Sequence, residues 1–63
     1  MSELFAPTLD DAIAEVDREI RVRERAYPRF VANGTVTQAR ADRQMAAMRE
    51  AKEQLHRLKG LEK

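Results

Sequence analysis

The sequence predicts an all-α fold: an antiparallel two-helix hairpin, kinked near Pro28 in its first helix, with two copies packed as a homodimeric four-helix bundle. Apolar residues recur at spacings of three and four in both halves of the chain, which is the helical period. Between the halves, Gly34 can end one helix and Thr37 can begin the next. Charged residues make up 37% of the 63 residues and aromatic residues only 5%, which favours one small helical domain.

The first helix is predicted over residues 9–33, after a flexible lead over residues 1–8. Thr8 is a suitable N-cap, and Asp10 and Asp11 in the first turn suit the positive end of the helix dipole. In the lead, Leu4 and Phe5 are apolar and can either pack back or serve as an anchor. A single stripe runs along the helix with Arg23 as its polar break, and its apolar members are Leu9, Ile13, Val16, Ile20, Tyr27 and Phe30.

The end of the first helix is marked by two signals. Pro28 removes one backbone hydrogen bond, so a kink is expected there rather than a complete break. Asn33-Gly34 is the expected stop, because glycine readily adopts the left-handed conformation after a helix. Asn-Gly also favours a β-hairpin turn, but neither flank alternates with a period of two.

The second helix is predicted over residues 37–59, with a C-terminal tail over residues 60–63. Thr37 serves as its N-cap, and Lys59-Gly60 is the expected end. Its apolar face is small at first and leucine-rich later: Ala41, Met48, Ala51, Leu55 and Leu58, with Met45 and Ala47 beside it. Met45 and Met48 can fill a core or form an adaptable binding surface.

Self-association is expected because two helices share only one face and the chain has no cysteine with which to form a disulfide. The predicted core and dimer residues are Leu9, Ile13, Val16, Ile20, Tyr27, Phe30, Met45, Met48, Leu55 and Leu58. A charge within such a stripe typically fixes register or pairs with a partner acid. We therefore expect Arg23 to pair across a dimer or partner interface.

The charges are unevenly distributed although the net charge is only +1. Residues 1–19 contain six acids and one base, whereas residues 20–44 contain six arginines. In an antiparallel hairpin these arginines form a basic pole at the turn end. The residues predicted to bind a partner are Arg21, Arg25, Arg29, Arg40 and Arg43. Three alternatives are open: a solvated face, a site for an acidic protein surface, or contact with phosphates.

No pattern in the sequence indicates catalysis, a metal site or a cofactor. His56 is the only histidine and has no cysteine beside it, so a recognisable metal or nucleophile site is not expected. The acids of the first helix are explained by capping, dipole and solubility roles. No apolar run approaches the ~20 residues that a membrane span needs, and a cytoplasmic, non-enzymatic protein is expected.

The segment from Arg18 to Gly34, followed by Thr37-Gln-Ala and a helix with Met45 and Met48, resembles small uncharacterised bacteriophage and prophage proteins. They share a Tyr-Pro-Arg-x-Val stretch, a glycine and a Thr-Gln-Ala step. The resemblance covers roughly residues 15–58. It implies expression inside a bacterial host and action by contact with a host or phage protein.

Two functional hypotheses follow. The first is a phage-derived interaction module that binds and modulates, and by expectation inhibits, a host or phage protein with an acidic surface. The alternative is a nucleic-acid-associated accessory factor for phage replication, recombination or transposition. The near-zero net charge favours the first.

Overall fold

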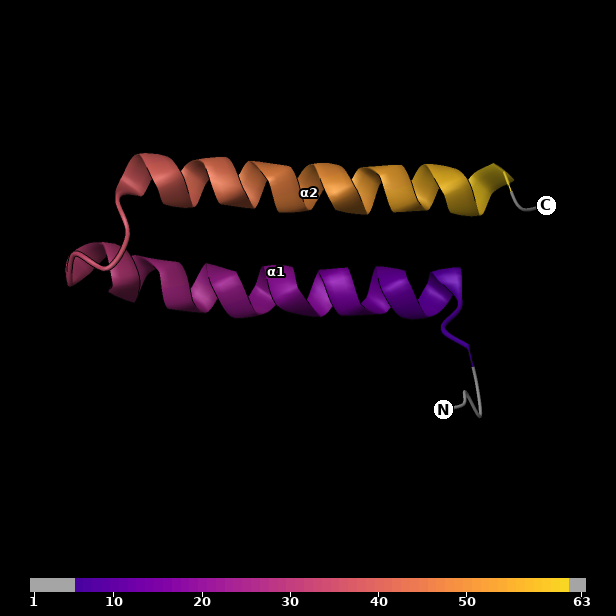
Figure 1. The fold of residues 1–63 in the computed structure, drawn as a ribbon, viewed down its shortest axis with the longest axis horizontal. Helices are drawn as coiled ribbons and strands as arrows, with labels where there is room; N and C mark the ends of the chain where they lie inside the picture. Colours follow the sequence, from indigo (N-terminus) through magenta and orange to yellow (C-terminus); the bar gives the residue numbers. More distant parts are fainter. Residues whose placement is uncertain (1–5, 62–63) are drawn as a thin grey trace.

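The computed structural model describes residues 6–61 and shows two helices, α1 (Leu9–Ala32) and α2 (Gln38–Leu61), with no strand in that range. They run antiparallel side by side, joined by residues 33–37 (Figure 1). The molecule is long and flat, with extents of 43 × 29 × 15 Å. The predicted helical hairpin is therefore confirmed.

A capping box fixes the start of α1. The Asp11 amide donates to Thr8 Oγ1 at 3.1 Å, and the Thr8 amide donates to Asp11 Oδ2 at 2.9 Å. Two backbone donors that the helix cannot satisfy internally are thereby paired. The predicted cap at Thr8 is confirmed, and the reciprocal bond from the Thr8 amide to Asp11 Oδ2 adds to it. Thr37 plays the same part for α2, since its Oγ1 accepts from the Arg40 amide at 3.1 Å.

The chain leaves α1 through a Schellman motif around Gly34. Gly34 has φ +83°, which a residue with a Cβ adopts only at a cost. The amide of Thr35 donates to the Phe30 carbonyl at 2.9 Å, and that of Gly34 to the Val31 carbonyl at 3.2 Å. These bonds satisfy carbonyls at the helix end. Asn33 Oδ1 closes the turn by accepting from both the amide and the hydroxyl of Thr35.

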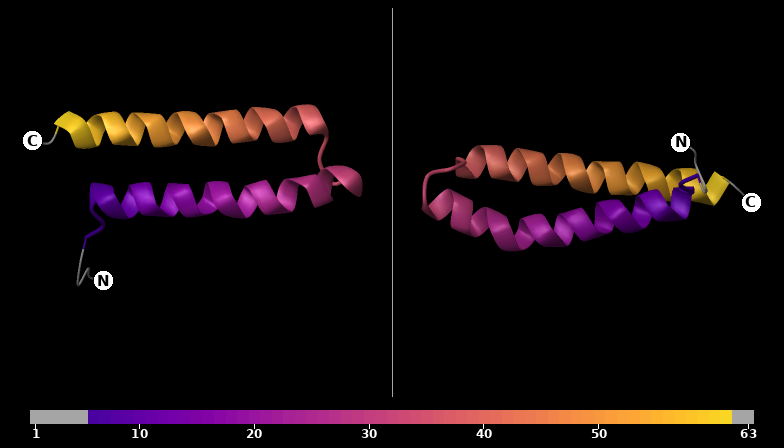
Figure 2. Two further views of the ribbon diagram at one scale, coloured as in Figure 1. Left: turned by 180° about the vertical axis from the view of Figure 1, so that it is seen from behind. Right: turned by 60° about the horizontal axis from the view of Figure 1, so that its bottom comes forward.

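Pro28 lies inside α1, which continues past it to Ala32. Because proline has no amide hydrogen, the Glu24 carbonyl lacks its usual helical donor. The ribbon of α1 bends toward its end in the segment that contains Pro28, as the tilted view shows (Figure 2, right).

Gly60 does not end α2, contrary to the prediction. The helix extends through it to Leu61. Glycine is only weakly unfavourable inside a helix, and Gly60, unlike Gly34, does not have a positive φ. The flexible lead with Leu4 and Phe5 lies largely outside the described residues.

The core between the helices is small. Among the described residues only Ile20, Ala41 and Met45 are buried. Six of the ten predicted core and dimer residues are half-buried: Leu9, Ile13, Val16, Tyr27, Met48 and Leu55. Phe30 and Leu58 were expected to be covered, but their relative exposures are 37% and 52%. Two helices cover one stripe on each other, and these two side chains lie beside that stripe.

Gly34→Ala is expected to destabilise the hairpin by about 1 kcal/mol, because alanine is strained at positive φ. Gly60→Ala makes the same chemical change in a helix and should instead stabilise by up to about 0.5 kcal/mol. Urea unfolding followed by circular dichroism, at one fixed protein concentration, measures both. Equal effects of the same sign would contradict the assigned turn.

Candidate interaction face

Ion pairs between the helices lie along one side of the hairpin, which we call the polar face. Lys52 Nζ lies 2.6 Å from Asp17 Oδ1, and an Arg49 guanidinium nitrogen lies 2.8 Å from Glu24 Oε2. These pairs set the register of α2 on α1. The residues that line the groove of this face are Asp17, Ile20, Arg21, Glu24, Arg49, Lys52, Glu53 and His56.

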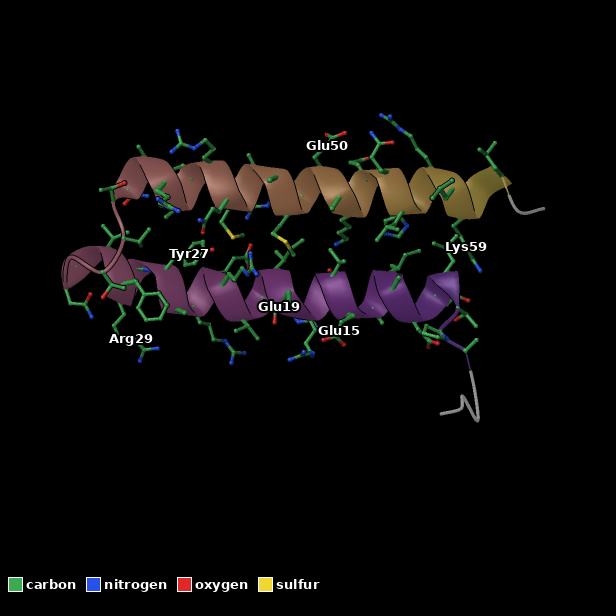
Figure 3. The ribbon with its side chains drawn as sticks, viewed as in Figure 1. Glu15, Glu19, Tyr27, Arg29, Glu50 and Lys59 are labelled. Atoms are coloured by element: carbon green, nitrogen blue, oxygen red, sulfur yellow. The ribbon has the colours of Figure 1, made fainter. Side chains whose placement is uncertain are left out.

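A third ion pair between the helices lies near the ends of the hairpin, where Lys59 Nζ is 2.9 Å from Asp10 Oδ1. Figure 3 shows Lys59 reaching from α2 toward the start of α1. This pair and that of Lys52 place the acidic first half of α1 beside basic residues of α2.

Asp17 has the most closely paired carboxylate of the polar face. Lys52 and Arg21 both donate to it at 2.6 Å. These two hydrogen bonds, the one from Lys52 first, hold the pKa of Asp17 below its ordinary value despite some desolvation. On the outside of α1, the Arg18 hydrogen bond similarly lowers the pKa of Glu15 and raises that of Arg18.

The groove of the polar face has a volume of about 470 Å³ and is open to solvent. A second open groove, of about 420 Å³, lies near Tyr27 and Pro28. His56 borders the first groove. Over residues 6–61 no three His, Cys, Asp or Glu side chains are placed so that they could share a metal ion.

A hydrogen bond links the helices on the side away from the polar groove. Tyr27 Oη donates to Gln44 Oε1 at 2.7 Å, and Figure 3 shows Tyr27 between the two helices. Both side chains are half-buried. The bond explains why a glutamine occupies the apolar stripe of α2, because it gives the buried end of the tyrosine a partner.

The side of the hairpin opposite the polar groove is mostly apolar, and we call it the open face. Its α1 residues follow spacings of four and three, and they are Ala12, Val16, Glu19, Arg23, Ala26 and Phe30. Its α2 residues follow the same spacing, and they are Gln44, Met48, Ala51, Leu55 and Leu58. None of them borders the groove of the polar face. Every one of them is half-buried or exposed, so the face is left partly uncovered by the hairpin itself.

Glu19 and Arg23 are the only charged residues of the open face. Arg23 Nε donates to Glu19 Oε1 at 3.0 Å, and the side chains of Arg23 and Glu19 are 35% and 36% exposed. This pair lies within one helix, at a spacing of four residues. The pairing of Arg23 across an interface stays a prediction.

The five arginines predicted to bind a partner do not gather on one surface. Arg21 is engaged with Asp17 on the polar face. Figure 3 shows Arg29 on the outer edge of α1, and Arg25 lies one turn before it on the same edge. Arg40 and Arg43 belong to α2, and Arg43 shares the outer edge with Glu50, two turns further on (Figure 3).

The turn half of the hairpin therefore carries two arginine pairs, Arg25 with Arg29 on α1 and Arg40 with Arg43 on α2. None of these four arginines forms an ion pair with a residue that the structure describes.

Comparison with known protein families, with curated proteins and with solved structures finds no match to this chain. The resemblance to phage proteins accordingly stays a prediction. Neither helix of the described part of the chain is sufficiently long and apolar to span a bilayer.

The open face as a continuous surface was missed by the sequence analysis, although its signal is present. The stripe that starts at Ala12 has the same spacing as the one that starts at Leu9. This stripe contains alanines and two central charged residues, so its sequence alone does not mark it as an apolar surface. The hairpin shows that it is continuous with the side of α2 that carries Met48 and Leu55.

Asp17→Asn is expected to make the folding stability of the protein less dependent on pH in the acid range. Because the folded-state pKa of Asp17 is lowered, its stabilising contribution is present above the unfolded-state pKa of about 3.9 and is lost as pH falls through the folded-state value. The variant should be less stable than the parent at pH 7, and the two should converge as the pH falls through the folded-state pKa of Asp17. Lys52→Met should behave likewise.

Thermal unfolding between pH 7 and pH 2, at fixed concentration and salt, provides this measurement. Glu53→Gln is the control, since Glu53 borders the same groove but forms no ion pair with the described residues. If the melting temperature of Asp17→Asn depended on pH in the same way as that of the parent, the Asp17–Lys52 pair would not contribute to the pH dependence of folding stability.

Proposed function

We propose that this chain is a non-enzymatic protein-interaction module, phage-derived, that works as a homodimeric four-helix bundle and binds and inhibits a host or phage protein in the bacterial cytoplasm. The observation that supports it best is the open face, where two helices side by side leave apolar side chains uncovered. Faces of this kind are typically covered by another chain.

The second copy is favoured as the occupant because the hairpin buries so little by itself. With three buried residues among those described and no cysteine, a 63-residue chain needs further burial to be stable. Packing two open faces together adds the side chains of Met48, Leu55, Phe30 and Leu58 to a shared core without any change in the hairpin.

The two arginine pairs are proposed as the contacts for the partner. Arg25 and Arg29 lie on the outer edge of α1 and Arg43 on that of α2, so these three stay accessible when the open faces meet. Guanidinium groups without an internal carboxylate bind carboxylates on a protein surface well, through bidentate hydrogen bonds. An acidic partner surface is therefore the expected target.

Ala51→Glu is expected to weaken the dimer at least tenfold, because it places a charge in the centre of the open face. Ala46→Glu makes the same change at another exposed alanine of α2, outside the open face, and should leave the dimer intact. Light scattering and sedimentation equilibrium over a range of protein concentrations measure both. A parent chain that is monomeric throughout, or equal effects of the two substitutions, would contradict the dimer.

Charge reversal at the outer edge of α1, in the double variant Arg25→Glu/Arg29→Glu, is expected to abolish capture of a partner protein from bacterial lysate. The physical reason is that repulsion replaces two charge-assisted contacts. Arg57→Glu is the control, because it reverses one charge at the other end of the hairpin, and it should leave capture unchanged.

Two outcomes would count against this site. Undiminished capture by the double variant would exclude the α1 edge as the contact. Binding of the purified chain to duplex or single-stranded DNA, with an affinity that falls steeply with salt, would support the nucleic-acid alternative, which relies on the same arginines.

A further inference from the structure

The order of side chains along the open face carries information about how a second copy packs on it. Resting on the proposed dimer, we propose that the two hairpins pack with α1 against α1 and α2 against α2, antiparallel, with the twofold axis passing between Glu19 and Arg23. The two turns then lie at opposite ends of the bundle.

The α1 stripe is complementary to its own reverse. Read from the two ends toward the middle, Ala12 meets Phe30, and Val16 meets Ala26. A small residue thus faces a larger one at each level, which is how facing layers of a helical core interdigitate. A twofold interface requires such self-complementarity, because residue i contacts residue j and residue j contacts residue i.

The centre of the same stripe is complementary in charge. In this arrangement Glu19 of one copy faces Arg23 of the other, twice across the axis. Within one hairpin the pair is already formed at 3.0 Å and about one-third exposed. The second copy would give each carboxylate a second guanidinium, so that covering these charges leaves neither without a partner.

The α2 stripe has its own centre between Met48 and Ala51. An antiparallel α2 pair about that point sets Met48 against Ala51 and Gln44 against Leu55. The pair of Met48 and Ala51 again places a large side chain against a small one. The side-chain carbonyl oxygen of Gln44 already accepts a hydrogen bond from the Tyr27 hydroxyl at 2.7 Å.

The centre of the α1 stripe and the centre of the α2 stripe lie at the same level of the hairpin, so one twofold axis can pass through both. The sequence of each helix taken alone does not require this agreement. The ion pairs Asp17–Lys52 and Glu24–Arg49 fix how α1 lies beside α2. Midway between these pairs, α1 is at residues 20–21 and α2 at residues 50–51. The two stripe centres, at residue 21 and at residues 49–50, agree with this register to about one residue, or ~1.5 Å along a helix.

The other face-to-face arrangement places both turns at one end and α1 against the partner's α2. Glu19 and Arg23 would then face the uncharged stripe from Gln44 to Leu58. No new partner would compensate for the water that they lose. In the proposed arrangement, moreover, the acid-rich first half of α1 lies beside the arginine-rich second half of its partner, as electrostatic complementarity favours.

A charge-swap experiment tests the pairing. Glu19→Arg and Arg23→Glu should each weaken self-association at least tenfold, since like charges then meet at the axis. An equimolar mixture of the two variants should recover a 1:1 dimer, and the double variant Glu19→Arg/Arg23→Glu should recover the homodimer. Circular dichroism of each variant checks that the helices are retained. Single variants that stay weak when mixed would overturn the pairing.

A distance measurement tests the orientation independently. Ala32 is exposed at the end of α1, so Ala32→Cys carries a spin label without touching the open face. Turns at opposite ends place residue 32 of the two copies about 33 Å apart along the helix direction, since each lies eleven residues from the axis at ~1.5 Å per residue. Turns at one end place the labels within about 20 Å.

The outcomes separate the two proposals. A monomeric parent chain overturns the dimer itself. A dimer with the short distance overturns only the orientation. A dimer with the long distance and with recovery on mixing supports both.

Discussion

The geometry of a helix pair governs this molecule. Two helices lying side by side can shield one stripe on each other, whereas α1 and α2 both carry apolar side chains on more than one stripe. Ile20, Ala41 and Met45 occupy the shielded stripe and are buried. The side chains that fall next to it form the open face. Both the small core and the uncovered surface thus have the same origin.

The electrostatic features act mainly on register and on direction. Surface ion pairs contribute little to stability because water screens them, and Asp17 and Lys52 are both more than one-third exposed. They favour the observed alignment over others, because shifting α2 by one turn would separate Asp17 from Lys52 and Glu24 from Arg49 together. The polar face in this way determines which residues of the two helices lie at the same level on the open face.

Local chemistry was predictable from the sequence wherever it depended on neighbours in the chain. The Thr8 cap, the stop at Gly34 and the pairing of Asp17 with Arg21 are all interactions over a few residues. Exposure of Phe30 and Leu58 was not predictable, because a helical stripe gives a direction but not the width that a partner helix covers. The arginines were expected to gather because the turn brings their segments together, yet position around each helix axis sends Arg29 and Arg43 to opposite edges.

Pro28 has a consequence for motion. It removes one rung from the hydrogen-bond ladder of α1, so the turn that follows, residues 29–32, is tied to the rest of the helix by one hydrogen bond fewer. That segment can open without disturbing the paired middle of the hairpin, and local openings of this kind require much less free energy than global unfolding. Arg29 belongs to this segment. Its guanidinium can therefore change position relative to Arg25 while the rest of α1 stays fixed, which gives one edge of the hairpin an adjustable spacing between charges.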